Sequence, residues 1–121
     1  MSEAVRWLAK PEESNYPAAL SYLSLIYDER TAKAKVEALR AAPLATFKAK
    51  DIFRASGLSL LGVSNKHVAK DQQKIHGGKE LSPLLLVRDG AHGRVIIADG
   101  YHRLCAVYSF DEDAEIPCKI V

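Results

Sequence analysis

Apolar residues in the first part of the chain recur three and four positions apart, which is the pattern of amphipathic helices. A helix is predicted over 17–28, with Asn15 as its capping residue. A second helix is predicted over 30–41, because Pro43 cannot continue it. Together they predict a helical hairpin. The residues expected to face inward are Leu20, Leu23, Ile26, Tyr27, Ala32, Val36 and Leu39.

The middle of the chain changes to shorter apolar runs. A strand is predicted over 44–48, and one helical turn that Gly57 ends is predicted over 51–55. Asn65 is the capping residue of a third helix, which runs to about His76. A buried connector between these two helical pieces is expected from Leu58, Leu60, Leu61 and Val63.

The last part of the chain alternates strands with one helix. Residues 84–88 are apolar on both faces and predict an interior strand. Pro117 indicates that the final strand lies at an edge, because proline cannot donate to a sheet. The fold class is therefore predicted to be α+β, a small mixed sheet flanked by helices. The elements after the interior strand are a loop over 89–93, a strand over 94–98, a helix over 101–110 and a strand over 116–121.

Composition narrows the class of protein. The chain has 121 residues, 48% hydrophobic and 26% charged, which predicts one globular domain over 1–121. A net charge of +2 is too small for a protein that holds DNA by counterion release, so no direct DNA binding is expected. No run reaches the roughly 18 apolar residues of a membrane span, so no membrane contact is expected. Cys105 and Cys118 lack the spacing of a zinc site and are interpreted as reduced thiols in a cytoplasmic protein.

The most informative passage is a strand that breaks at Asp99 and Gly100 directly into a helix. Free backbone N–H groups at such a helix start form an anion site, and glycine permits a phosphate to approach the main chain closely. His102 and Arg103 in the first turn would add charge, and an arginine can hold a phosphate through two hydrogen bonds. The alternative is structural: Asp99 caps the helix and Arg103 pairs with a surface carboxylate.

The helix after Asn65 carries a second, partly independent signal. His67, Lys70 and Lys74 lie three and four residues apart and therefore share one face. Two lysines at this spacing repel each other mildly unless an anion lies between them. The alternative is a solvated lysine face. The opposite face, which can meet the core, is formed by Val68, Gln72 and Ile75.

The segments 79–87, 99–106 and 116–121, in this order and spacing, resemble the ParB/sulfiredoxin superfamily. The resemblance covers 44–121 and implies that 1–43 is a helical extension outside the family core. It also implies that Gly100, His102 and Arg103 belong to a helix start that binds nucleotide phosphates. Tyr101 stands where sulfiredoxin has its catalytic cysteine and ParB its glutamate. The thiol for sulfinic acid repair and the acid of the ParB motif are therefore both missing.

These observations predict a cytoplasmic protein that binds ATP or another nucleotide, or a small phosphorylated ligand, with Mg²⁺ carried by the nucleotide. Phosphotransfer or nucleoside triphosphate hydrolysis is the predicted chemistry if the protein is an enzyme, with Asp99 and His102 as catalytic candidates. No metal site formed by the protein alone is predicted. The alternative is a non-enzymatic module whose N-terminal helices contact a second copy or a protein partner. The predicted binding residues are Gly100, Tyr101, His102, Arg103, His67, Lys70 and Lys74.

Overall fold

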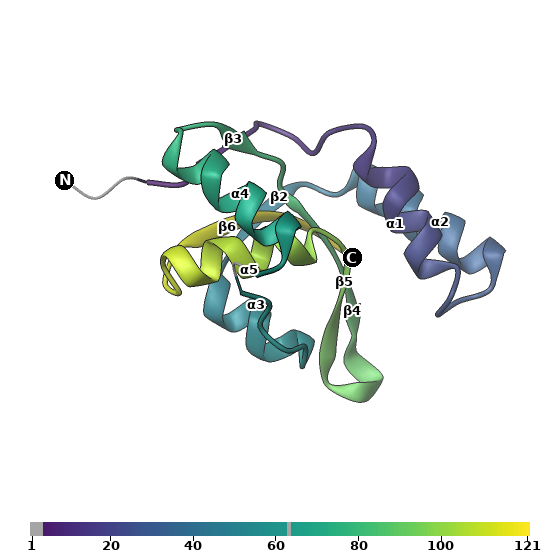
Figure 1. Cartoon of the computed structure of the whole chain (residues 1–121). Coiled ribbons are helices and arrows are strands. Elements are labelled where there is room, and N and C mark those ends of the chain that lie inside the picture. The colour runs from purple at the N-terminus through teal and green to yellow at the C-terminus, as the bar shows by residue number, and fades with distance from the viewer. Residues whose placement is uncertain (1–3, 63) are drawn as a thin grey trace.

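The computed structural model describes residues 4–62 and 64–121, and this part of the chain forms a mixed α+β domain with two small sheets and five α-helices. The larger sheet has the strand order β2-β6-β4-β5 and carries helices on both sides (Figure 1). Its strands are β2 (Leu44–Lys48), β4 (Leu84–Asp89), β5 (Arg94–Asp99) and β6 (Glu115–Ile120). The helices are α1 (Asn15–Leu23), α2 (Glu29–Ala41), α3 (Ala49–Ser56), α4 (Lys66–His76) and α5 (Tyr101–Phe110). The smaller sheet pairs β1 (Arg6–Trp7) in parallel with β3 (Glu80–Leu81).

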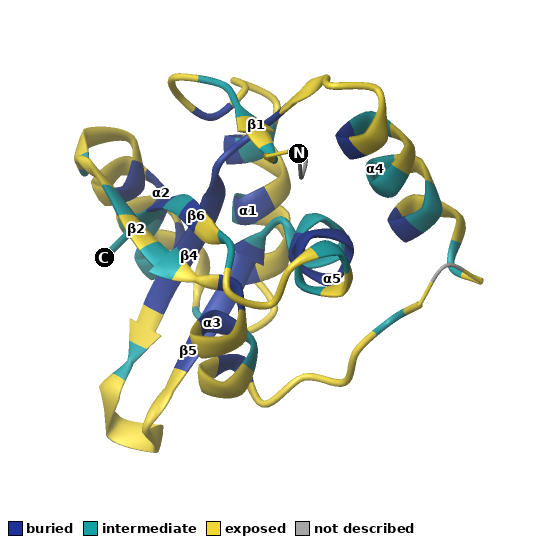
Figure 2. Ribbon diagram, turned by 90° about the vertical axis from the view of Figure 1, so that its left-hand side faces the viewer, coloured by how far each residue is buried: buried dark blue, intermediate teal, exposed yellow. Residues whose placement is uncertain are grey.

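Alternation along β4 divides the core between the two faces of the sheet. Leu84 and Leu86 join the cluster that includes residues of α3, α4 and α5, which we call the α3-side core. Leu85 and Val87 join the cluster under α1 and α2, which we call the hairpin-side core. Because β4 lies between β6 and β5 and is buried from both sides, the prediction of an interior strand is confirmed (Figure 2).

Several local signals predicted their elements correctly. Residues 44–48 form β2, and α5 covers 101–110. The side chain of Asn65 accepts hydrogen bonds from the backbone N–H groups of His67 at 2.9 Å and Val68 at 3.3 Å, so it caps α4 as expected. Gly57 ends α3 with a φ of +67°. These signals depend on neighbouring residues alone, which is why the sequence carries them.

The first helix differs from its prediction. It begins at Asn15 and ends at Leu23, and Ser14 rather than Asn15 is its N-cap residue. The Ser24 hydroxyl donates to the Leu20 carbonyl at 2.7 Å. After Ser24 the backbone N–H groups of Leu25 and Ile26 donate to carbonyls three residues earlier instead of four, and Ile26 is exposed. The expected inward position of Ile26 was therefore wrong.

The single helical turn predicted over 51–55 is a longer helix in the structure. Helix α3 spans Ala49–Ser56, because two N–H groups of its first turn find acceptors outside the helix. Ala49 donates to the Ala114 carbonyl and Lys50 to the Glu112 carbonyl, both at 2.9 Å. A loop far away in the sequence therefore starts this helix two residues earlier than local signals predict.

The connector after α3 was also predicted wrongly. Leu58 and Leu60 are exposed and Leu61 is half-buried, because the segment runs along the surface between α3 and α4 (Figure 2). Val63, the fourth residue of the expected connector, lies outside the described residues. Leu58 and Leu60 are therefore apolar side chains on the surface, where a buried segment was expected.

The edge position predicted from Pro117 is wrong. Strand β6 pairs with β2 on one side and with β4 on the other. Pairing with β4 begins only at Cys118, so Pro117 has a single neighbouring strand, in which Thr46 lies opposite. A proline is accommodated here because the second ladder starts after it.

Candidate functional site

The start of α5 is shaped by Gly100. Strand β5 ends at Asp99, and Gly100 turns the chain with a φ of +110°. A Cβ atom at this position would lie 2.8 Å from Leu84 Cγ and 2.9 Å from Arg103 Nη2, so only glycine fits without displacing its neighbours. Within 4–62 and 64–121, no side chain accepts a hydrogen bond from the first N–H groups of α5. The expected alternative in which Asp99 caps the helix is therefore not what the structure shows.

Arg103 pairs with a carboxylate from its own motif. Its Nη2 lies 3.0 Å from Asp99 Oδ2, and the two side chains are 17% and 19% exposed. The same nitrogen lies 3.4 Å from Asn15 Oδ1 and 3.5 Å from the Pro83 carbonyl. Its buried Nε has no hydrogen-bond partner among the described residues. The ion pair in the structural alternative is thus present, with Asp99 rather than a distant surface acid.

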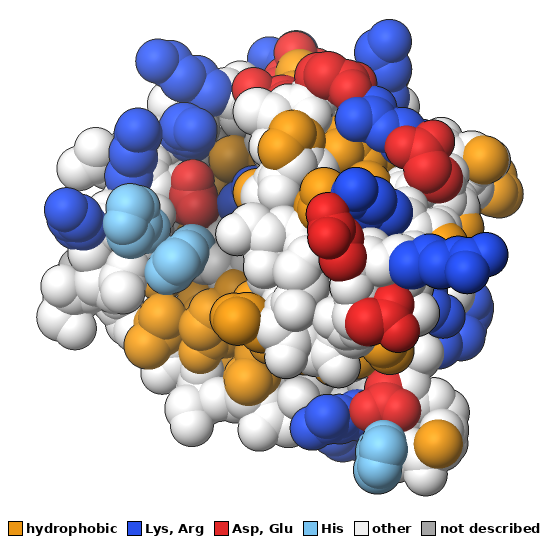
Figure 3. Space-filling model, turned by 90° about the vertical axis from the view of Figure 1, so that its right-hand side faces the viewer, with side chains coloured by type: hydrophobic (Ala, Val, Ile, Leu, Met, Phe, Trp, Pro, Cys, Tyr) orange, Lys and Arg blue, Asp and Glu red, His pale blue; other side chains and the backbone are white. Residues whose placement is uncertain are grey.

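The residues predicted to bind a ligand surround one hollow of about 220 Å³, which we call the α4–α5 hollow. Helix α4 packs on α5, and this packing faces the basic side of α4 toward the start of α5. In Figure 3 histidine side chains (pale blue) lie beside a group of basic side chains (blue) on one part of the surface. All seven predicted binding residues and Asp99 therefore meet at one site. The hollow is lined by His67, Lys70, Asp71, Lys74, Asp99, Gly100, Tyr101, His102 and Arg103.

Three rings border this hollow. The ring centroids of His67 and His102 lie 4.9 Å apart, and those of Tyr101 and His102 lie 5.8 Å apart. The Tyr101 hydroxyl donates to the Ser59 carbonyl, which ties the connector after α3 to the site. Burial raises the pKa of Tyr101 above its ordinary value, so its hydroxyl stays protonated at neutral pH. The hydrogen bond to Ser59 therefore fixes the Tyr101 ring at the border of the hollow.

Asp71 is the residue that sequence reasoning missed. Partial burial raises the pKa of its carboxyl, while the charges of Lys74, Arg103 and the two histidines of the hollow oppose that rise. The signal was present in the spacing, since Asp71 follows His67 by four residues and precedes Lys74 by three. It escaped notice because only basic residues were considered on this face.

The charges of the hollow favour an anion. Lys70, Lys74 and Arg103 outnumber the two carboxylates even when both histidines are neutral. Among the described residues no carboxylate forms an ion pair with Lys70 or Lys74, whereas Asp99 is engaged by Arg103. The uncapped N–H groups of α5 add a partial positive charge. Asp99 Oδ2 is paired with Arg103, so Asp99 is placed to orient that guanidinium.

Of the two cysteines, Cys105 lies behind the site, where its thiol interacts with the Tyr101 side chain. Both are free and buried, as predicted for Cys105, a residue of the α3-side core. Burial raises the pKa of the Cys105 thiol and raises that of Cys118 to about 12. A buried thiol with a raised pKa is a poor nucleophile, so Cys105 does not replace the missing sulfiredoxin cysteine.

In the described part of the chain, no group of three or more His, Cys, Asp or Glu side chains is arranged to hold a metal ion. None of the helices within 4–62 and 64–121 has the length and apolar character needed to cross a membrane.

Comparison of the chain with models of protein families, with curated proteins and with solved structures found no match. The resemblance to the ParB/sulfiredoxin superfamily therefore stays a prediction that depends on the motif around Gly100 and the order of the neighbouring elements.

Proposed function

We propose that the α4–α5 hollow binds the phosphate groups of a nucleotide or of a small phosphorylated molecule. The observation that carries this proposal is the convergence of Lys70, Lys74 and Arg103 on the uncapped N-terminus of α5. Each element alone has an ordinary structural explanation. Their meeting concentrates cationic side chains and free N–H groups around one small space, and oxyanions bind to that combination.

The size of the hollow limits how the ligand would lie. A volume of about 220 Å³ is below the roughly 300 to 1,000 Å³ of pockets that enclose a whole drug-sized ligand. A nucleotide would therefore place its phosphates in the hollow and its nucleoside outside. The donor set fits the phosphates. If Mg²⁺ arrives with the nucleotide, Asp71 is the acid best able to contact it, because Asp99 is already paired with Arg103.

Phosphotransfer or triphosphate hydrolysis is the chemistry that this arrangement would support, since positioning and charge neutralisation supply most of the catalysis in such reactions. His102, whose ring lies beside that of His67, is the candidate to move a proton. Asp99 orients the Arg103 guanidinium through their ion pair. Cytoplasmic localisation is part of the proposal and agrees with the two free thiols.

Calorimetric titration with ATP, ADP, CTP and inorganic phosphate, each with and without Mg²⁺ at fixed salt, tests this proposal. The double variant Lys70→Gln/Lys74→Gln should weaken binding about two- to thirtyfold, since each partly solvated lysine contributes about 0.2 to 1 kcal/mol. Lys66→Gln is the matched control, because Lys66 is exposed on the same helix and does not line the hollow. Equal affinities in all three proteins would place any bound phosphate elsewhere.

Arg103 needs a gentler substitution than alanine, since alanine would leave Asp99 unpaired. Arg103→Lys keeps the charge and loses the planar fork that holds two phosphate oxygens. We expect the affinity to fall by about 1.5 to 3 kcal/mol, the contribution of a hydrogen bond to a charged group. His92→Ala, at an exposed histidine of the β4–β5 hairpin, should leave the affinity unchanged. A loss as large for His92→Ala would mean that the titration reports general changes in the protein.

One observation favours a second candidate function, an interaction module without catalysis. The turn between α1 and α2 exposes Tyr22, Leu25 and Ile26, and Leu25 is 85% exposed. A second copy of this chain could cover these side chains. Sedimentation velocity of Leu25→Glu beside the parent protein tests this candidate, because a charged residue in an apolar contact would dissociate a dimer. A parent that sediments as a monomer at high concentration would contradict self-association through this turn.

A further inference from the structure

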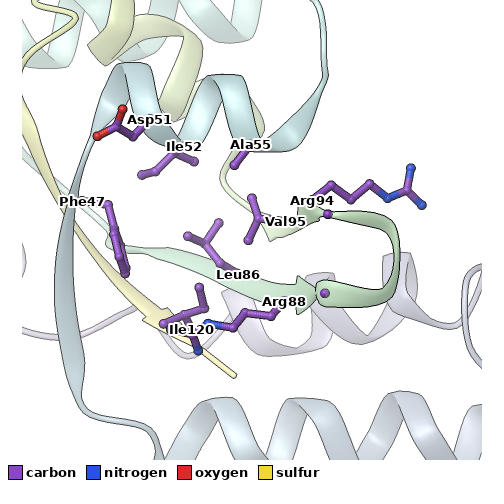
Figure 4. Close-up of a pocket in the computed structure, with 11 residues that line it drawn as sticks. Phe47, Asp51, Ile52, Ala55, Leu86, Arg88, Arg94, Val95 and Ile120 are labelled. Atoms are coloured by element: carbon purple, nitrogen blue, oxygen red, sulfur yellow. The ribbon is translucent and has the colours of Figure 1, made fainter.

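A second concave site lies under α3, on the sheet face opposite the α1–α2 hairpin. It has a volume of about 410 Å³, and it shares no lining residue with the α4–α5 hollow. Figure 4 shows it between α3 and the strands, near the end of the β4–β5 hairpin. We call it the α3 pocket. Its apolar lining comes from Phe47, Ile52, Ala55, Leu86, Val95 and Ile120.

The base of the α3 pocket is rigid and its mouth is open. Ile52, Leu86 and Val95 are buried members of the α3-side core, so they are fixed by packing on their other sides. Gly90 and Gly93 border the pocket without any side chain to close it, and a Cβ atom at either position would meet nothing within 4 Å. A volume within the usual range of ligand pockets, with a preformed apolar base, is suited to a small apolar group.

The charged residues that line the α3 pocket differ in whether they form ion pairs. Arg88 follows Leu86 by two residues on β4, so the alternation of the strand puts it on the pocket side of the sheet. Among the described residues no carboxylate pairs with Arg88. The other charged lining residues have partners: Asp51 lies 3.4 Å from Arg54, and Arg94 lies 3.0 Å from Asp89 and is directed away from the pocket in Figure 4.

We propose that the α3 pocket binds an amphipathic carboxylate, with a hydrocarbon chain or ring against the apolar base and the carboxylate on the Arg88 guanidinium. An arginine can bind a carboxylate through two parallel hydrogen bonds, and Arg88 has no competing acid. The apolar base supplies most of the binding free energy through burial, and the arginine selects ligands with a negative end. This site is independent of phosphate binding at the α4–α5 hollow.

The test uses decanoate as the probe, titrated into the full chain by calorimetry below its micelle-forming concentration. Saturable binding is expected, and Arg88→Gln should weaken it about fivefold, the upper end of what an exposed ion pair contributes. Decanol, which has the chain without the charge, should bind the parent protein as weakly as decanoate binds Arg88→Gln. Arg30→Gln is the matched control, because Arg30 is an exposed arginine of α2 on the opposite face of the sheet.

Ala55→Trp tests the location, since Ala55 lies on α3 and its side chain points into the pocket in Figure 4. A tryptophan there should fill the space and abolish decanoate binding. Amide shift mapping in the parent protein gives a readout that does not depend on this variant folding. Decanoate should shift amides of α3 and of the β4–β5 hairpin and leave α4 unchanged. No saturable binding, equal affinity for Arg88→Gln, equal affinity for decanol, or shifts confined to α4 would each overturn the proposal.

Discussion

Gly100 is under two constraints that no other residue type satisfies together. Its φ of +110° is a conformation that residues with a Cβ rarely adopt, and its α-carbon faces Leu84 and the Arg103 guanidinium at close range. A side chain here would strain the backbone and displace the group that we propose contacts phosphate. The same residue therefore determines the stability of the turn and the geometry of the α4–α5 hollow.

Gly100→Ala should lower the free energy of unfolding by about 1 to 3 kcal/mol, the cost of one strained backbone position, with the Leu84 contact adding to it. Urea unfolding measures this loss. Gly90→Ala is the matched control, because Gly90 has no positive φ and open space around its α-carbon. A loss of equal size in Gly90→Ala would show that the effect is not specific to the turn at Gly100.

Asp71 should make stability depend on pH. Burial raises the pKa of the Asp71 carboxyl in the folded protein above the ordinary 3.8 of the unfolded chain. At a pH between the unfolded and the folded pKa, the folded protein therefore binds more protons than the unfolded chain. The contribution of Asp71 to the free energy of unfolding therefore decreases as the pH rises through this window, and the ionised carboxylate is a cost at neutral pH. Asp71→Asn should flatten this part of the pH profile, measured by urea unfolding at a series of pH values. A profile identical to that of the parent protein would contradict the raised pKa.

The same substitution should change the affinity for a phosphate. Removing a carboxylate from among Lys74, Arg103 and the histidines should strengthen metal-free phosphate binding by up to about fivefold, because the contribution of a partly exposed charge is at most about 1 kcal/mol. Calorimetry with inorganic phosphate measures this gain. With a Mg²⁺-nucleotide the sign reverses if Asp71 contacts the metal. Weaker binding of metal-free phosphate to Asp71→Asn would contradict the electrostatic account of the hollow.

Among the helices, α4 has the clearest link between a local cap and the site. The Asn65 side chain satisfies two of the N–H groups at its start, and the basic face begins in this first turn, at His67. Asn65→Ala should lower the free energy of unfolding by about 1 kcal/mol and weaken phosphate binding slightly, because the first turn that carries His67 would fray. Asn65→Ser, which can still cap, should behave like the parent protein in both thermal unfolding and titration. Equal losses in the two variants would mean that the cap is not the cause.

The elements that the sequence predicted well depend on contacts between near neighbours. Asn65 caps its own helix, and the continuous apolar run in β4 indicates an interior strand without knowledge of its partners. The errors come from residues whose partners are far away in the chain. Asn15 resembles a cap, yet its side chain accepts a hydrogen bond from the Ser82 hydroxyl and lies near Arg103. Pro117 resembles an edge residue because the point at which β4 begins to pair cannot be seen locally.

For the candidate site, the sequence indicated which residues lie together but not how their side chains pair. Its two halves, the helix start at Gly100 and the basic face of α4, each had a sequence signal, and they line the same hollow. The pairing of Arg103 with Asp99 and the presence of Asp71 were not predicted. Both depend on how side chains share a small space, which spacing alone does not determine.

For the molecule as a whole, the α1–α2 hairpin occupies a face of the sheet. Leu23 and Leu39 are fully buried, and they share the hairpin-side core with Leu85 of β4 and Ile96 of β5. Arg103 of α5 contacts Asp99 and also Asn15, the first residue of α1, so it links helices on the two faces of the sheet. The hairpin is therefore expected to be lost together with the sheet during unfolding.

Leu39→Ala tests this coupling. Truncating a fully buried leucine should lower the free energy of unfolding by about 2 to 5 kcal/mol through lost burial and the remaining cavity. The single tryptophan, Trp7, packs against the α3-side core and reports the far side of the sheet. If the molecule is one cooperative unit, the unfolding transitions followed by Trp7 fluorescence and by amide exchange in α2 should both shift to lower denaturant concentration by the same amount.

Lys33→Ala, at an exposed position of α2, is the control and should change the free energy of unfolding by no more than about 0.5 kcal/mol. Early loss of the α2 amides with an unchanged Trp7 transition would instead make the hairpin an extension that unfolds separately, as the resemblance to the ParB/sulfiredoxin core implies.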